Sequence, residues 1–182
     1  GASRFVQRVW RLVNAAAPHL PKPGTPIANS EEALALRRVA HRTLAEISTS
    51  IERLRFNTAI AKLYTFVGAL ADVVDGPAKL LETNPAVAAA AREAFDILAV
   101  LISPMMPHLA EEMWAALGHT QLLAETAWPE ADPRLIIDDQ ATVAVQVNLL
   151  TEGINGPRLP MEEMTPIWKP HGNSIKPDTF NE

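Results

Sequence analysis

Residues 30–54 read SEEALALRRVAHRTLAEISTSIERL, and this stretch decides the fold class. Ser30 is a good N-cap, and Glu31 and Glu32 follow in the first turn, where the helix dipole favours acidic groups. Apolar side chains then recur every three or four residues, the spacing of one buried helix face. They are Leu34, Leu36, Val39, Ala40, Leu44, Ile47, Ile51 and Leu54. The pattern predicts one long amphipathic helix.

The same spacing predicts further helices on both sides, separated by proline and glycine. We expect helices over residues 3–16, from Asn57 to the break at Gly76-Pro77, from Pro85 to Ile102, and from Pro107 to Leu117. The first would bury Phe5, Val6, Val9, Trp10 and Val13, and the third Ile60, Leu63, Tyr64, Val67 and Leu70. Asn57 is expected to cap the third helix rather than read a base, and Phe56 to lie in the core rather than stack on one.

The pattern changes after the helices. Residues 142–148 alternate valine with smaller or polar residues, which predicts a strand. Residues 149–182 hold five prolines and three glycines and show no period. The predicted fold is mainly α, an antiparallel helical bundle with a short β segment and an irregular tail. We divide it into a bundle (1–134), a segment with the strand (135–148) and a Pro/Gly-rich tail (149–182).

Composition excludes several classes of protein. The chain has no cysteine, so disulfides, thiolate metal sites and a cysteine nucleophile are excluded. No apolar run approaches the roughly 18 residues that span a bilayer, and residues 1–10 do not resemble a signal peptide. We therefore expect no membrane partner and a cytoplasmic location, or an organellar matrix in a eukaryotic homologue.

The charge is unevenly distributed. The net charge is −5, but residues 1–62 hold ten Lys or Arg against four Asp or Glu, and residues 63–182 hold six against seventeen. Such asymmetry indicates an anion-binding surface on the early helices. The alternative is that these charges only solvate helix surfaces or face other protein domains.

Three groups of basic residues are candidates for RNA binding. Arg4, Arg8 and Arg11 share the polar face of the first helix. The second helix contributes a cluster around Arg37, with Arg38, His41 and Arg42. The turn after this helix contributes a pair, Arg53 and Arg55. The alternative for the cluster is pairing with Glu31, Glu46 and their neighbours.

No other constellation carries chemistry. His108, Glu111 and Glu112 share a helix face, but no second motif completes a metal site, so we expect structural acids and neither metal nor cofactor. Trp114 is expected to be a core or interface anchor. No nucleophile–base pair or glycine-rich phosphate loop is visible, so no catalytic residue is predicted in this chain.

Four segments, in this order, resemble leucyl-tRNA synthetases, bacterial-type class I aminoacyl-tRNA synthetases. They are residues 4–13 (RFVQRVWRLV), 51–61 (IERLRFNTAIA), 103–114 (SPMMPHLAEEMW), and Trp128-Pro129 with the strand from Val143 to Asn148. The resemblance covers residues 1–148 and implies the helical anticodon-binding domain of that family. It further implies that the bundle grips the stem of tRNA(Leu), while a catalytic domain absent from this sequence carries out ATP-dependent leucylation.

The tail after Asn148 departs from the family. One hypothesis is therefore a tRNA-binding domain acting with a separate catalytic chain. The alternative is a synthetase-derived bundle recruited as a non-catalytic subunit or scaffold of a larger assembly. In either case the tail would dock through apolar residues, and no DNA partner is expected. The candidate docking residues are Met164, Ile167, Trp168 and Phe180.

Overall fold

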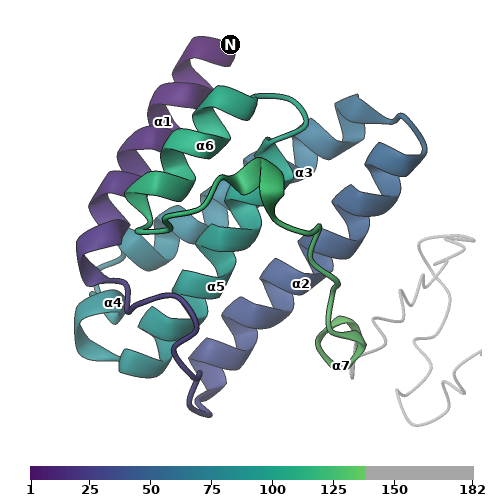
Figure 1. Ribbon diagram of the computed structural model, residues 1–182. Coiled ribbons are helices and arrows are strands. Elements are labelled where there is room, and N and C mark those ends of the chain that lie inside the picture. The colour runs from purple at the N-terminus through teal and green to yellow at the C-terminus, as the bar shows by residue number, and fades with distance from the viewer. Residues whose placement is uncertain (138–182) are drawn as a thin grey trace, which may run out of the picture. The chain divides into compact units, whose positions relative to one another are not determined.

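The computed structural model describes residues 1–137, which form a bundle of helices (Figure 1). The elements are α1 (Ala2–Ala16), η1 (Ala17–His19), α2 (Glu31–Glu52), α3 (Phe56–Val74), α4 (Leu80–Thr83), α5 (Pro85–Ile102), α6 (Pro107–Ala116), η2 (Leu123–Glu125) and α7 (Pro133–Ile136). The predicted mainly α bundle is confirmed. The predicted strand at 142–148, the tail and its docking residues Met164, Ile167, Trp168 and Phe180 lie outside the described residues.

Local chemistry sets the helix boundaries. Ser30 caps α2, since its hydroxyl accepts a hydrogen bond from the Ala33 amide at 3.0 Å. Asn84 caps α5 in the same way, accepting from the amides of Ala86 and Val87 at 3.1 and 3.3 Å. Pro85 occupies the first turn of α5, where a missing amide proton does no harm. These boundaries agree with those that the sequence predicts.

Helix α5 is the centre of the bundle (Figure 1). It contacts α2, α3, α4 and α6, and all its residues are buried except Pro85, Glu93 and Asp96. Six of its first ten residues are alanines, whose small side chains let neighbouring helices approach closely. Helices α2, α3, α4 and α6 therefore pack their inner faces on α5, while α1 packs on α3 and α6 and α7 packs on α2.

Several residues predicted to be core are exposed, so the predicted faces of α1, α2 and α3 need correction. Helix α3 is apolar on two faces, and only one of them faces α5 and α2. That face buries Ala59, Leu63, Phe66, Val67 and Leu70, and leaves Ile60 and Tyr64 half exposed. The other residues predicted to be core but exposed are Trp10, Leu34, Val39, Leu54 and Phe56.

The predicted cap at Asn57 is also wrong. Helix α3 begins one residue earlier, at Phe56, and its N-cap position is Arg55, which makes no side-chain cap hydrogen bond. Asn57 is thus the second residue of the helix. The start of α3 is fixed by how α2 ends.

Helix α2 ends in a Schellman motif. The amide of Arg55 donates to the carbonyl of Ser50 (2.7 Å), and the amide of Leu54 donates to that of Ile51 (2.9 Å). The motif needs left-handed backbone at Leu54, where φ is +55°. Helix α6 ends in the same motif with Gly118 in that place, at φ +88°. A leucine is costly there because its Cβ crowds the following carbonyl.

Replacing Leu54 by glycine should therefore stabilise the domain. We expect Leu54→Gly to raise the free energy of unfolding by about 1 kcal/mol, since glycine adopts this backbone without strain. Urea unfolding followed by circular dichroism measures it. In the matched control, Gly118→Ala should lower the same quantity by about 1 kcal/mol, since its Cβ would meet no neighbouring atom and only backbone strain acts. A destabilised Leu54→Gly variant would contradict this account.

Candidate nucleic-acid interface

Helix α1 presents three arginines to solvent. Arg4, Arg8 and Arg11 are exposed, while Phe5, Val9, Leu12 and Val13 on the other side of the helix are buried. Arg8 and Arg11 line a groove of about 620 Å³ between α1 and the end of α3, where Asp75 is the acidic residue. The predicted separation of the arginine face from the buried face of α1 is confirmed.

The turn between α2 and α3 presents two more arginines. Arg53 and Arg55 are exposed on either side of Leu54. Within residues 1–137, these two and the three arginines of α1 form no ion pair. Their charges are therefore open to an external anion. We call the five residues Arg4, Arg8, Arg11, Arg53 and Arg55 the exposed arginine set.

The candidates on α2 lie differently. Arg38 and Arg42 are half-buried, and each has an interaction within the chain. Arg37 pairs with Glu93 of α5, not with Glu31 or Glu46, through contacts of 2.6 Å (Nε–Oε2) and 3.1 Å (Nη2–Oε1). Glu46 instead pairs with Lys62 of α3. The cluster that the sequence groups together is thus divided between surface and interior.

His41, which the sequence groups with the candidates for RNA binding, has a structural position. Its side chain is only 8% exposed. Nδ1 accepts a hydrogen bond from the Asp132 amide at 3.1 Å, so the ring proton lies on Nε2, 3.2 Å from Glu93 Oε1. Both ring nitrogens are used inside the fold. His41 joins α2 to α5 and to the segment before α7, and we call Arg37, His41, Glu93 and Asp132 the α2–α5 junction.

Glu93 stays ionised at this junction. Burial alone would raise its pKa, but hydrogen bonds from His41 and Arg37 and the charge of Arg37 outweigh it and lower the pKa to about 2. The hydrogen bond to Glu93 and the negative charge of Glu93 in turn raise the pKa of Arg37. The junction is therefore a charged contact that holds two helices together.

A second polar contact joins α5 to the end of α6. Arg92, 5% exposed, bonds Asp96 Oδ2 at 3.3 Å, and His119 Nε2 lies 2.9 Å from Asp96 Oδ1. The His119 ring stacks on Trp114, with centroids 3.5 Å apart. Burial raises the pKa of Asp96, against the hydrogen bond from His119 and the charge of Arg92. The core position expected for Trp114 is confirmed.

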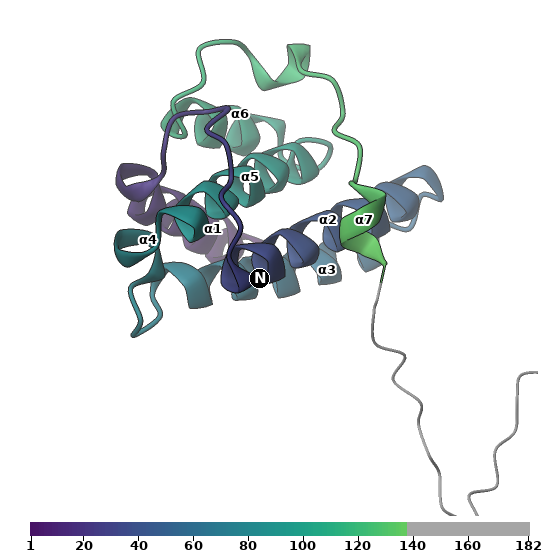
Figure 2. The same ribbon diagram turned by 90° about the horizontal axis from the view of Figure 1, so that it is seen from below.

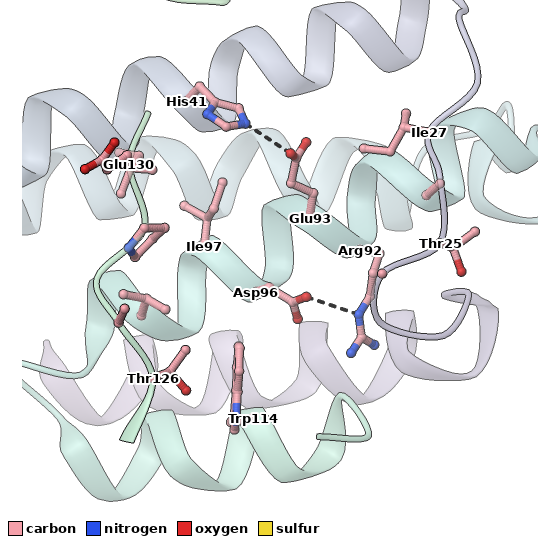
Figure 3. Close-up of a pocket in the computed structure, with 16 residues that line it drawn as sticks. Thr25, Ile27, His41, Arg92, Glu93, Asp96, Ile97, Trp114, Thr126 and Glu130 are labelled. Carbon is pink, nitrogen blue, oxygen red and sulfur yellow. Dashed lines mark hydrogen bonds and ion pairs between the residues drawn. The ribbon is translucent and has the colours of Figure 1, made fainter. Parts of the chain in front are cut away.

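Both contacts border one pocket of about 410 Å³ between α2, α5 and α6 (Figure 3). Figure 3 shows the side chains of Glu93 and Asp96 directed toward His41 and Arg92, respectively. Each charged group of α5 in the pocket wall thus has a partner within the fold. The exposed arginine set lies elsewhere, on α1 and at the α2–α3 turn.

Comparison with known proteins identifies this arrangement. Residues 34–155 match the family described as the anticodon-binding domain of tRNA ligase. The chain belongs to this family of anticodon-binding domains. The leucine–tRNA ligases of Afipia carboxidovorans and Rhodopseudomonas palustris are 59% and 60% identical to it over 148 and 151 residues, 81% of this chain. The predicted relation to leucyl-tRNA synthetases is therefore confirmed.

A solved structure supports the same relation. The crystal structure of an Agrobacterium radiobacter K84 LeuRS in a ternary complex with tRNA and LeuAMS matches 74% of this chain, with a TM-score of 0.58 and 26% identity. That match takes in 16% of the LeuRS chain, and this chain spans 17% of the length of the two leucine–tRNA ligases above. This chain therefore corresponds to one part of much longer enzymes.

Of the acids of α6, Glu111 has a structural role in this domain. Both Glu111 carboxylate oxygens accept backbone hydrogen bonds, from Leu123 (2.8 Å) and Ala124 (2.9 Å), and so hold the start of η2. His108 and Glu112 are exposed. Within residues 1–137 no group of three or more His, Asp or Glu could hold a metal ion, and no helix has the length and apolarity to cross a bilayer.

Sequence reasoning missed one feature of the surface of the anticodon-binding domain. Phe56, Ile60 and Tyr64 follow one another at four-residue intervals on α3, and all are about 40% exposed. The signal was present, because α3 carries apolar residues at positions 59, 63, 66 and 70 as well. Two apolar faces on one helix indicate either a helix buried on both sides, as α5 is, or a second apolar face outside the core.

The α2–α5 junction predicts a pH dependence of stability. A Glu93 pKa lowered from 4.5 to about 2 stabilises the fold above pH 4.5, and this stability is lost as the pH falls toward 2. We expect Glu93→Gln to lower the free energy of unfolding by about 2 kcal/mol at pH 7, because it leaves Arg37 without its charged partner. Urea unfolding of both proteins at pH 7, 5 and 3 measures the difference, which should shrink below pH 4.5. A difference independent of pH would show that the charge of Glu93 is unimportant.

Proposed function

We propose that this domain binds tRNA(Leu) through the exposed arginine set and positions it for leucylation by a catalytic part outside this chain. The observation that carries the proposal is that five arginines of an anticodon-binding domain are exposed and form no ion pair within residues 1–137. The solved LeuRS complex with tRNA supports the choice of partner.

The chemistry of arginine suits the RNA backbone. A guanidinium group is always charged and binds two phosphate oxygens at once. Arg4, Arg8 and Arg11 lie along one side of α1 over about two turns, so successive phosphates of one strand could meet successive side chains. Such contacts fix the position of a folded RNA without reading its sequence. The domain would thus act by orienting tRNA, and ATP-dependent chemistry would belong to the rest of a longer enzyme.

The other residues and partners that the sequence suggests have less support. Arg38 and Arg42 are left out of the exposed arginine set, because they are half-buried and engaged within the chain. The alternative, a bundle recruited as a scaffold, depends on residues 149–182, outside the described residues. A separate catalytic chain and a cytoplasmic location also stay predictions.

The proposal predicts a salt-dependent affinity for tRNA(Leu). Each phosphate contact contributes about 0.7–0.9 to the slope of log affinity against log salt concentration. The double substitution Arg8→Ala/Arg11→Ala should therefore reduce the slope by roughly 1.5 and weaken binding at low salt. Filter binding of the full chain to a tRNA(Leu) transcript measures the slope and the affinity. The salt concentration is varied between roughly 25 and 200 mM, where phosphate contacts dominate.

Arg134→Ala is the matched control. Arg134 is exposed on α7 but pairs with Asp132 at 2.8 Å, and its loss should leave slope and affinity unchanged. If the α7 variant lost as much of the slope per removed charge as the α1 variant, only total charge would matter. Absence of salt-sensitive binding by the unaltered chain would contradict the proposed function.

A further inference from the structure

The end of the α2–α3 pair carries an unusual group of side chains. Arg53, Leu54, Arg55 and Phe56 follow one another there, and we call them the hairpin tip. All four are exposed, Leu54 by 76% and Phe56 by 40%. Figures 1 and 2 show from two directions that this end of α2 and α3 extends beyond the neighbouring helices. The tip is therefore accessible to a large partner.

The stability of the domain does not account for Leu54. Its side chain lies mostly in water, and its backbone is left-handed, at φ +55°. The same motif at the end of α6 uses Gly118, which has no Cβ to strain. A strained residue with an exposed apolar side chain is a reason to look for function.

The surroundings of the tip join apolar and basic groups. Phe56 begins a half-exposed strip on α3 that continues through Ile60 to Tyr64. The Tyr64 ring lies 4.4 Å from the ring of Phe5 on α1, whose sequence neighbour is Arg4. The strip therefore runs from Arg53 and Arg55 toward the arginines of α1. Cationic groups stand near both ends of an aromatic and aliphatic surface.

We infer that the hairpin tip binds an unpaired nucleotide of a folded RNA, with the base against Phe56 and Leu54 and its phosphates at Arg53 and Arg55. This inference rests on the proposed tRNA binding and specifies which part of the RNA the tip contacts. The backbone of a paired stem offers phosphates, to which leucine and phenylalanine add nothing. A base in a loop or bulge offers an exposed face, and stacking on an aromatic ring suits such a base whatever its identity.

The test compares two RNAs. One is a tRNA(Leu) transcript, and the other is a fully paired RNA duplex of the same number of nucleotides. Binding of the full chain is measured by filter binding at several salt concentrations. We expect Phe56→Ala to lower the affinity for the transcript between about fivefold and a hundredfold, to leave the salt slope unchanged, and to leave duplex binding unchanged. Phe56→Tyr should retain most of the affinity.

Leu54→Gly separates function from folding. It should weaken binding of the transcript although the variant resists urea better than the unaltered chain. Leu122→Ala is the matched control, because Leu122 is an exposed apolar residue (57%) between α6 and η2, away from the tip. This control should bind both RNAs as the unaltered chain does.

The outcomes distinguish this inference from the proposed function. If both tip variants bind the transcript normally while Arg8→Ala/Arg11→Ala does not, tRNA binding stands and the tip has another partner, such as a protein surface. If Phe56→Ala weakens the duplex and the transcript equally, the tip does not recognise an unpaired base. If the unaltered chain binds neither RNA at low salt, both the inference and the proposed function are wrong.

Discussion

The burial of α5 on nearly every side is the constraint on which the rest of this domain depends. An alanine-rich helix can occupy the centre of a bundle, but α5 also carries Arg92, Glu93 and Asp96 within two turns. Charged groups in such a place destabilise a fold unless they are paired and hydrogen-bonded. Each therefore has its partner: Arg37 and His41 for Glu93, and His119 with Arg92 for Asp96. Apolar packing holds the domain together. The charged pairs join α5 to α2 and to the end of α6.

The same constraint decides which basic residues stay outside. Arg37 and His41 are drawn to the interior by Glu93. The arginines of α1 and of the α2–α3 turn have no buried acid to meet within the described residues, and they remain in solvent. Within residues 1–137, the arginines that are exposed without an ion pair thus lie on α1 and at the α2–α3 turn. This division between internal and external cations makes an RNA-facing role physically reasonable for the exposed arginine set.

Sequence predicted what local chemistry controls. The capping by Ser30, the proline at the start of α5 and the glycine after α6 act within a few residues, so these helices could be placed from the sequence. The buried face of α3 could not, because Ile60 and Phe66 are equally apolar and only the position of α5 decides between them. The pairing of His41 with Glu93 joins residues 52 positions apart, and no local pattern distinguishes His41 from Arg38 or Arg42.

Protection of individual arginines tests the central claim most directly. Phenylglyoxal modifies accessible guanidinium groups, and mass spectrometry of the modified chain with and without tRNA(Leu) reports each one. The account predicts that tRNA protects Arg4, Arg8, Arg11, Arg53 and Arg55 and leaves Arg134 on α7 reactive. Protection of Arg134 as strong as that of the five, or protection of none of them by a tRNA that is bound, would contradict it.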